Sequence, residues 1–189
     1  MAAVATTRCA EMTLRELCPD DEAAFRIAIA EWGYDPDSEF AFDFDPDEPF
    51  DHYIAKLARW SRGEDIPERF VANTFLIGVL DDGRIVGRIS IRHELNEILF
   101  TLGGHIGYMV VPKCRRQGYG TRLLAEAIPV AHKLKIDRIL VTCDEDNIGS
   151  RKIIEANGGV YENTFSTPNM KQPKRRYWID PPAVIDDAS

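Results

Sequence analysis

The chain has 189 residues, of which 44% are hydrophobic and 29% charged, and its formal net charge is −8. This balance is that of a folded domain rather than a disordered chain, and no apolar run approaches the roughly 20 residues that span a bilayer. An acidic surface repels phosphate groups, so we expect neither nucleic acid nor a membrane among the partners.

The first half of the chain combines helical and alternating patterns. Apolar residues recur at helical spacing in two segments, and Asp20 or Asp21 is expected to cap the first of them. Further on, two alternating segments flank Asp81-Asp82-Gly83, which indicates a hairpin because glycine accepts a positive φ in a tight turn. The expected elements are a strand at residues 12–17, helices at residues 22–32 and 50–61, and strands at residues 74–80 and 84–92.

The second half alternates strands with helices. Residues 121–135 carry an apolar stripe typical of a helix, and residues 138–143 form an apolar run suited to a strand covered on both faces. Asn157-Gly158-Gly159 is typical of a helix C-terminus. The expected elements are strands at residues 105–111, 138–143, 160–165 and 175–179, and helices at residues 121–135 and 148–156.

Together these elements predict one mixed α/β domain over residues 1–180, with residues 181–189 as a loose C-terminal tail. The N-terminus lacks the continuous apolar stretch of a signal peptide, which favours a cytoplasmic location. The cysteines show no C-x-x-C pair, so neither a disulfide framework nor a zinc site is indicated and we expect no metal. They are Cys9, Cys18, Cys114 and Cys143.

Residues 110–121 are the most informative segment about function, because a strand there runs into a glycine loop that opens a helix. Gly118 and Gly120 let the backbone approach a ligand closely, and the N–H groups of a helix N-terminus attract anions. Arg115 and Arg116 add charge-assisted hydrogen bonds to phosphate. A pyrophosphate fits this loop, although two glycines before a helix also form ordinary turns and paired arginines are often solvated.

The pattern Arg115-x-x-Gly118-x-Gly120 after Val110-Val111-Pro112 resembles the acetyl-coenzyme A loop of the GNAT acetyltransferase superfamily. The resemblance implies that family's fold, with a mixed, mostly antiparallel central sheet flanked by helices, and acetyl-CoA as co-substrate. It also implies that the loop holds the pyrophosphate while the preceding strand pairs with the pantetheine arm. The implied contacts are Met109, Val110 and Val111 for the pantetheine, and Arg115, Arg116, Gln117, Gly118, Tyr119, Gly120 and Thr121 for the phosphates.

A second stretch, residues 146–159, is similar to a later motif of the same superfamily. The similarity implies that Asn147 and Ser150 contact the cofactor, whereas Asn147 taken alone is an ordinary helix N-cap. The likeness extends over residues 75–180 to a bacterial subgroup known mainly as predicted acetyltransferases. It supports the fold and the acetyl donor but names no acceptor.

The reaction implied by the resemblance is direct attack of a neutral amine on the thioester in a ternary complex, with backbone N–H groups near Met109 and Val110 holding the oxyanion. An ammonium with a pKa of about 10.4 must first lose a proton. We predict His105 or Glu94 as the catalytic base, and water as an alternative relay. His105 begins the strand that lines the cofactor and shares the face of Met109, and Glu94 follows the preceding strand on the face of Arg92.

The sequence leaves open which side chain protonates the leaving thiolate. The superfamily often uses a tyrosine in its late helix, and this chain has Ile154 at the matching position. Tyr108, Tyr119 and Tyr161 stay open as substitutes.

The acidic segment at residues 43–48 admits two interpretations. It lacks the glycine and the final glutamate of an EF-hand loop, so we do not expect calcium there. The segment is either a solvated loop or a site where Asp43, Asp45 and Asp47 attract a cationic amine, with nearby phenylalanines packed over it.

Two other functions are compatible with the glycine loop: a non-catalytic acyl-CoA-binding module of the same fold, and a nucleotide-binding regulator. The second lacks the G-x-x-x-x-G-K-[ST] pattern. The expected acceptor is an amine on a small molecule or a peptide, and a homodimer is the default assembly.

Overall fold

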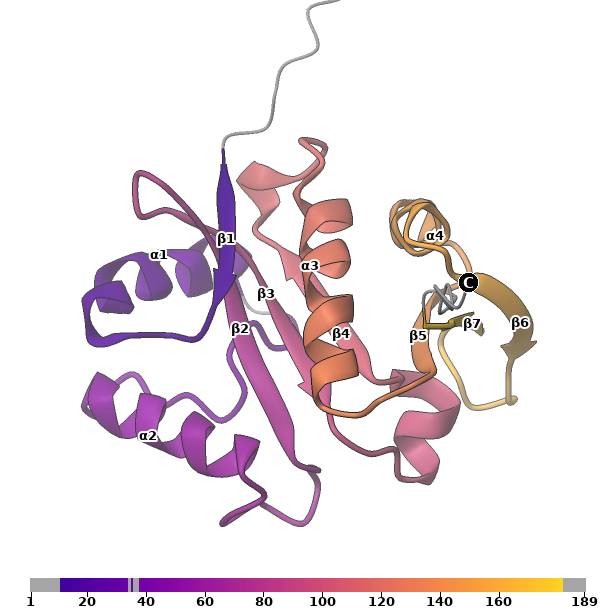
Figure 1. Cartoon of the computed structure of the whole chain (residues 1–189), viewed down its shortest axis with the longest axis horizontal. Coiled ribbons are helices and arrows are strands. Elements are labelled where there is room, and N and C mark those ends of the chain that lie inside the picture. Colours follow the sequence, from indigo (N-terminus) through magenta and orange to yellow (C-terminus); the bar gives the residue numbers. More distant parts are fainter. Residues whose placement is uncertain (1–10, 34, 36–37, 182–189) are drawn as a thin grey trace, which may run out of the picture.

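The chain folds into two antiparallel sheets that touch at one point (Figure 1). In this computed structural model, which describes residues 11–33, 35 and 38–181, the first sheet has the order β1-β2-β3-β4 and the second the order β5-β7-β6. The strands are β1 (Met12–Arg15), β2 (Asn73–Leu80), β3 (Ile85–Arg92), β4 (Ile106–Val110), β5 (Ile139–Asp144), β6 (Val160–Phe165) and β7 (Lys174–Ile179).

Helices α1 (Glu22–Trp32) and α2 (Phe50–Ser61) cover one face of the first sheet, and α3 (Tyr119–Lys133) covers the other (Figure 1). Phe25 of α1 packs edge-on against Phe75 of β2. On the opposite face, Leu123 of α3 lies against Gly78 and Gly87, where a Cβ atom would approach its side chain to 2.7 Å. Helix α4 (Ile148–Ala156) lies on the α3 side, because Asn157 Nδ2 donates to the Thr121 carbonyl at 3.1 Å.

The two sheets meet at Gly104, which forms a single bridge with Val141. Gly104 has φ +68°, and a Cβ atom there would lie 2.5 Å from the Leu140 carbonyl oxygen, so only glycine permits this approach. Past this bridge the sheets separate: among the described strands, β4 pairs with β3 alone. One backbone edge of β4 therefore faces the gap between the sheets.

The predicted α/β class, with mostly antiparallel strands and flanking helices, is confirmed, and the predicted order of elements is correct. Some local predictions differ from the structure. Asp21 holds the N-cap position of α1 as predicted, but its side chain makes no capping hydrogen bond. Its carboxylate accepts instead from the Cys18 N–H at 2.8 Å and from Arg15, in a short 3-10 turn before the helix. His105 lies just outside β4, and α3 begins at Tyr119.

Three short helical segments complete the described fold: the 3-10 turns η1 (Pro19–Asp21) and η3 (Pro112–Cys114), and the π-helical turn η2 (Leu99–Gly103), which precedes β4. The sequence analysis did not predict η2. The predicted tail lies almost entirely outside the described residues, which end at residue 181. None of the described helices is long and apolar enough to cross a membrane.

Candidate active site

A groove with a cavity volume of about 780 Å³ opens where β4 and the second sheet separate. It is bounded by the N-terminal ends of α3 and α4. This size is typical of small-molecule and cofactor sites. The residues that line it are Trp32, Tyr108, Met109, Val110, Cys114, Arg115, Arg116, Gly118, Gly120, Thr121, Asn147, Ile148, Gly149, Ser150, Lys152 and Ile153.

The N-terminus of α3 opens onto this groove. Gly118 occupies the N-cap position with φ +86°, and no side chain caps the helix there. The first N–H groups of a helix have no partner within it, and the helix dipole places partial positive charge at this end. Arg115, Arg116 and Lys152 add side-chain charge to the same groove. The arrangement suits a diphosphate.

Arg115 is held in place by the strand and by the first helix. Its Nε donates to the Val110 carbonyl at 3.1 Å, and its guanidinium lies 5.2 Å from the centre of the Trp32 ring. Beside it, Lys113 forms a 2.6 Å ion pair with Glu31 of α1. These contacts fix the loop between β4 and α3 against the end of α1.

Gly120 lets α3 pack tightly on its neighbours. A Cβ atom at this position would lie 2.6 Å from Ile153 Cδ1 of α4 and 3.4 Å from Val110 Cγ2 of β4. A larger residue would require the Ile153 side chain to move. The second glycine of the loop thus favours the close packing that shapes the groove, as well as lying at its wall.

The N-terminus of α4 forms the opposite wall. Asn147 Oδ1 accepts from the Ser150 N–H at 2.9 Å, so Asn147 is the N-cap of the helix. Both residues also line the groove. The structural interpretation of Asn147 is confirmed, and its contact with the cofactor stays a prediction.

Residues 11–160 match the family model described as an acetyltransferase (GNAT) domain. The chain belongs to this family. Similar solved structures include a GNAT-family acetyltransferase from Streptococcus pneumoniae, with TM-score 0.60, 18% identity, and coverage of 90% of this chain and 99% of that chain. A GNAT-family acetyltransferase from Bacillus anthracis has TM-score 0.58 and 21% identity over 90% of this chain and 96% of that one.

The structure of yncA from Salmonella typhimurium with its cofactor acetyl-CoA has TM-score 0.58 and 16% identity over 89% of this chain and 93% of that one. At these identities the structural likeness shows the fold alone. No curated protein matches the chain in sequence. The family model therefore carries the assignment, and this chain is a GNAT acetyltransferase.

Most of the predicted cofactor residues of this GNAT chain line the groove, but three do not. Val111 is buried at 1% exposure, and Gln117 donates to the Lys113 carbonyl. Gln117 and Tyr119 line a separate cavity of about 340 Å³ between α1 and the β2–β3 hairpin. The groove residues that the sequence analysis did not assign to the cofactor are Trp32, Tyr108, Cys114, Ile148, Gly149, Lys152 and Ile153.

Of the three tyrosines left open as acids, only Tyr108 lines the groove. Its hydroxyl donates to the Ser150 carbonyl at 3.3 Å, and burial raises its pKa above the usual value. Tyr161 lies exposed on β6, with its hydroxyl 2.9 Å from that of Thr164. Ile154, at the position of the usual family tyrosine, is fully buried.

The two predicted bases lie outside the groove lining. His105 Nδ1 accepts from the Leu140 N–H at 2.9 Å, so the neutral ring carries its proton on Nε2. Burial and the nearby Arg92 lower the pKa of His105 to about 4. With its lone pair in use, the ring joins the two sheets, which weighs against the predicted role as a base. Glu94 is exposed, two residues beyond the end of β3.

Part of the acidic segment is paired with basic side chains of the protein. Asp43 forms ion pairs with Arg69 at 2.9 Å and Lys56 at 3.4 Å, and Lys56 also lies 3.7 Å from Glu48. The nearby phenylalanines pack inward, with Phe40 at 2% exposure and Phe44 against the rings of Phe25 and Tyr53. In the described part of the chain, no cluster of side chains could hold a metal ion.

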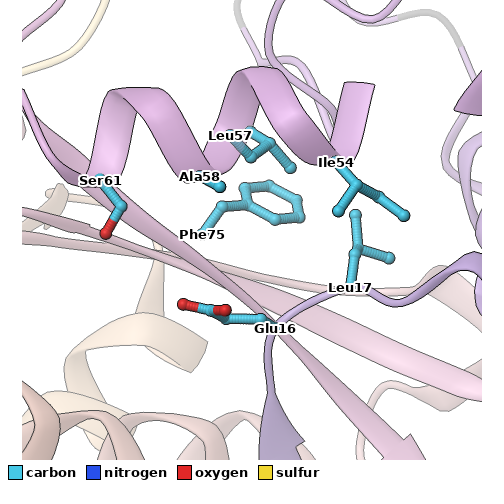
Figure 2. A pocket seen from close by; sticks show the side chains of 7 residues that line it. All are labelled: Glu16, Leu17, Ile54, Leu57, Ala58, Ser61 and Phe75. Atoms are coloured by element: carbon cyan, nitrogen blue, oxygen red, sulfur yellow. The ribbon is translucent and has the colours of Figure 1, made fainter. Parts of the chain in front are cut away.

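A third cavity, of about 40 Å³, lies beneath α2 (Figure 2). It has room for about one water molecule. Its lining is mostly aliphatic, with Glu16 and Ser61 as the polar members. Its lining has no basic or nucleophilic group beyond these two.

Proposed function

We propose that this protein transfers the acetyl group of acetyl-CoA to a primary amine, by direct attack of the amine on the thioester in a ternary complex. The observation that carries the proposal is the uncapped N-terminus of α3, which opens beside Arg115 and Arg116 at one end of the unpaired edge of β4. A diphosphate and an extended chain that can pair with a strand are the two parts of coenzyme A that such a groove fits.

In this proposal the diphosphate binds the first turn of α3, and the pantetheine lies along β4 as an added strand. The thioester then reaches the gap between the sheets near Met109. Backbone N–H groups of β4 on that open edge hold the oxyanion that forms when the amine attacks the carbonyl carbon. The C–S bond breaks, and the CoA sulfur leaves as a thiolate.

Tyr108 is the proposed donor to that sulfur. It lines the groove, and burial keeps its hydroxyl protonated at neutral pH by raising its pKa. In the balanced step, the sulfur takes the phenol proton and the phenolate regains a proton from the acetylated, positively charged nitrogen. The chain thus places a tyrosine on β4 although the helical position of the family tyrosine is Ile154.

For the proton that the ammonium loses before attack, we retain Glu94, acting through water. Its carboxylate is exposed to solvent, whereas the Nδ1 lone pair of His105 is bonded to the Leu140 amide. Replacement of Glu94 by Gln, with acetyl-CoA affinity as the control, tests this assignment. Unchanged kcat/KM at every pH leaves water as the sole relay.

The first experiment is calorimetric titration of acetyl-CoA and CoA into the wild type and Gly118→Glu. The substitution places bulk and negative charge at the N-terminus of α3, so we expect micromolar binding in the wild type and a loss of at least roughly 100-fold in the variant. Gly63→Glu is the matched control, since Gly63 also has positive φ, +82°, and lies in open space after α2. No binding to the folded wild type would overturn the proposal.

A non-catalytic acyl-CoA-binding module is the second candidate, and Ile154 favours it. This residue is 0% exposed where the family often has its acid, so the chain lacks that group. Binding of CoA without turnover of any amine in a broad panel would establish this function in place of the transferase.

A further inference from the structure

A row of polar side chains lies buried on the face of the first sheet that α1 and α2 cover. In the β3–β4 register, Arg88 is opposite Met109 and Ser90 is opposite Gly107. Arg88 is 3% exposed and Ser90 is 2% exposed. Arg92 continues the row, and its guanidinium lies over Gly107, where a Cβ atom would approach Nη2 to 3.2 Å. Met109 Sδ lies 3.2 Å from Arg88 Nη2, and Met109 also lines the groove, so this face meets the groove at β4.

Backbone carbonyls, not carboxylates, hold the two guanidiniums. Arg88 donates to the carbonyls of Glu39 at 2.8 Å and Phe40 at 3.1 Å. Arg92 Nη1 donates to the carbonyls of Gly103 and Gly104, both at 3.0 Å. Within residues 11–33, 35 and 38–181, neither arginine forms an ion pair with an acid, and Arg92 Nη2 bonds no described residue.

Such a pair is costly to bury without an anion. Burial lowers the pKa of Arg88 to about 9 and that of Arg92 to about 10, and the two charges repel each other. The free-energy cost of burying the two charges is lowest when a negative group binds beside them and accepts a hydrogen bond from Arg92 Nη2. The site is therefore built to receive an anion.

Arg176 on β7 adds a second, independent observation. The Tyr177 hydroxyl donates to Glu155 of α4, so alternation places Arg176 on the face away from α4, the same side of the molecule as Arg92. Arg176 is 7% exposed; its Nη1 forms an ion pair with Glu162 at 3.2 Å, while its Nε and Nη2 are buried without a partner among the described residues. Its guanidinium lies 4.7 Å from the ring centre of Phe100, so η2 is held between Arg92 and Arg176.

We propose that the acceptor carries a carboxylate beside its amine, as an α-amino acid does, and that this carboxylate binds Arg92 above Gly107. Arg88 adds positive potential to the same side, whereas the charge of Arg176 is partly offset by Glu162. The amine of such an acceptor then points toward β4, where the thioester arrives along the open edge of the strand near Met109. The inference rests on the proposed function and assigns its acceptor class.

The acidic segment agrees with this charge pattern. Its Asp43 is already paired with Lys56 and Arg69, so it has no strong attraction left for a cationic acceptor. The buried charges nearest β4 are positive. An acceptor with only amines would meet repulsion there, whereas a zwitterion would not.

The test compares matched acceptors, each α-amino acid against its carboxamide and against the amine left by removing the carboxyl group. With the wild type we expect kcat/KM to be roughly 10- to 100-fold higher for the amino acids, the range of a hydrogen bond to a charged group. Arg92→Gln should remove that preference, mainly through KM, and Arg92→Lys should restore part of it. Arg26→Gln is the control, because Arg26 is also half-buried and also donates to a loop carbonyl, that of Pro46.

The outcomes separate this inference from the proposed function. Turnover of amines with equal or lower rates for the amino acids overturns the carboxylate site and leaves the transferase intact. Binding of acetyl-CoA with no turnover of any acceptor overturns the transferase itself. If Arg92→Gln fails to fold, Gly107→Ala is the second variant. The added Cβ atom would lie 3.2 Å from Arg92 Nη2 and displace the guanidinium. A preference that survives in folded Gly107→Ala with an unchanged KM counts against the site.

Discussion

On the α3–α4 side, the residues of the groove come mainly from two short stretches of sequence, around Gly118 and around Asn147. On the α1–α2 side, each arginine of β3 donates to a segment outside its own strand: the loop at Glu39 and Phe40 for Arg88, 48 and 49 residues away, and η2 with Gly104 for Arg92, 11 and 12 residues away. The proposed cofactor side is therefore local in sequence, and the proposed acceptor side is assembled by the fold.

This difference fits the two tasks. A diphosphate is bound by backbone N–H groups and a helix dipole, which a short motif supplies in any member of the family. An acceptor is recognised by side chains whose neighbours differ from one protein to the next. Variants on the acceptor side should therefore alter stability and acceptor choice while acetyl-CoA binding is retained.

The largest effect is expected at Phe25, which is 0% exposed and contacts the rings of Phe40, Phe44, Phe50, Tyr53 and Phe75. This cluster joins α1, α2 and the following loop to the sheet. Phe25→Ala should lower the free energy of unfolding by about 3–5 kcal/mol, because it leaves a cavity among aromatic rings. Denaturant unfolding measures the loss.

The same variant, Phe25→Ala, also tests whether the two sides of the sheet are independent. In the fraction that stays folded, acetyl-CoA affinity should change by less than about twofold, because Phe25 touches no groove residue of α3 or α4. Phe100→Ala is the control, since Phe100 is 48% exposed and its loss should cost far less. A large loss of acetyl-CoA affinity in folded Phe25→Ala would show that the two sides are not independent.

What the sequence could predict follows the same division. The loop with Arg115 and Gly118 was found because all its groups lie within one turn of a helix start, and Asn147 was found as both a cap and a motif residue. Lys152 and Ile153 were missed, although they follow the groove residue Gly149 by three and four positions, the spacing of one helical face. Trp32 was missed because it reaches the groove from α1, through a contact with Arg115 that no local pattern encodes.

The acceptor side could be predicted only in part. Alternation in β3 correctly placed Arg88, Ser90 and Arg92 on one face, but which carbonyls they meet depends on η2 and on the loop after α1. His105 was expected to act as a base from its place beside β4. Its true partner is the Leu140 amide, and that contact depends on how the two sheets meet.

A prediction of intermediate size concerns how the stability of the protein depends on pH through His105. Its pKa is lowered to about 4 in the folded protein, whereas the unfolded side chain titrates near about 6.5. Between these values the unfolded state binds more protons, so stability is full above pH ~6.5 and falls as the pH drops toward 4. Because the ring is only half-buried, we expect roughly 1–2 kcal/mol from this group after screening by solvent.

His105→Asn isolates that contribution, since the amide oxygen can still accept from Leu140 without titrating. As the pH falls from 7 to 4, the wild type should lose roughly 1–2 kcal/mol of stability relative to the variant, which lacks this titration. Retained kcat/KM in the same variant is expected if the ring only joins the sheets. A large loss of kcat/KM with unchanged stability would return His105 to the role of base.

The smallest effect is expected from the acidic segment, and it sharpens the charge difference between the two sides. Neutralising Asp43, Asp45 and Asp47 to Asn removes exposed charges that salt screens, one of which is already paired with Lys56 and Arg69. The KM for an amino-acid acceptor should change by less than about twofold. If the segment attracts a cationic acceptor, KM instead rises tenfold or more, and the carboxylate of the acceptor ceases to be the group that the protein selects. Steady-state kinetics with one amino acid and its decarboxylated amine, each at low and at physiological salt, distinguish the two cases. Attraction by an exposed acidic loop weakens as the salt concentration rises. The interaction with a buried arginine on β3 is screened much less by salt.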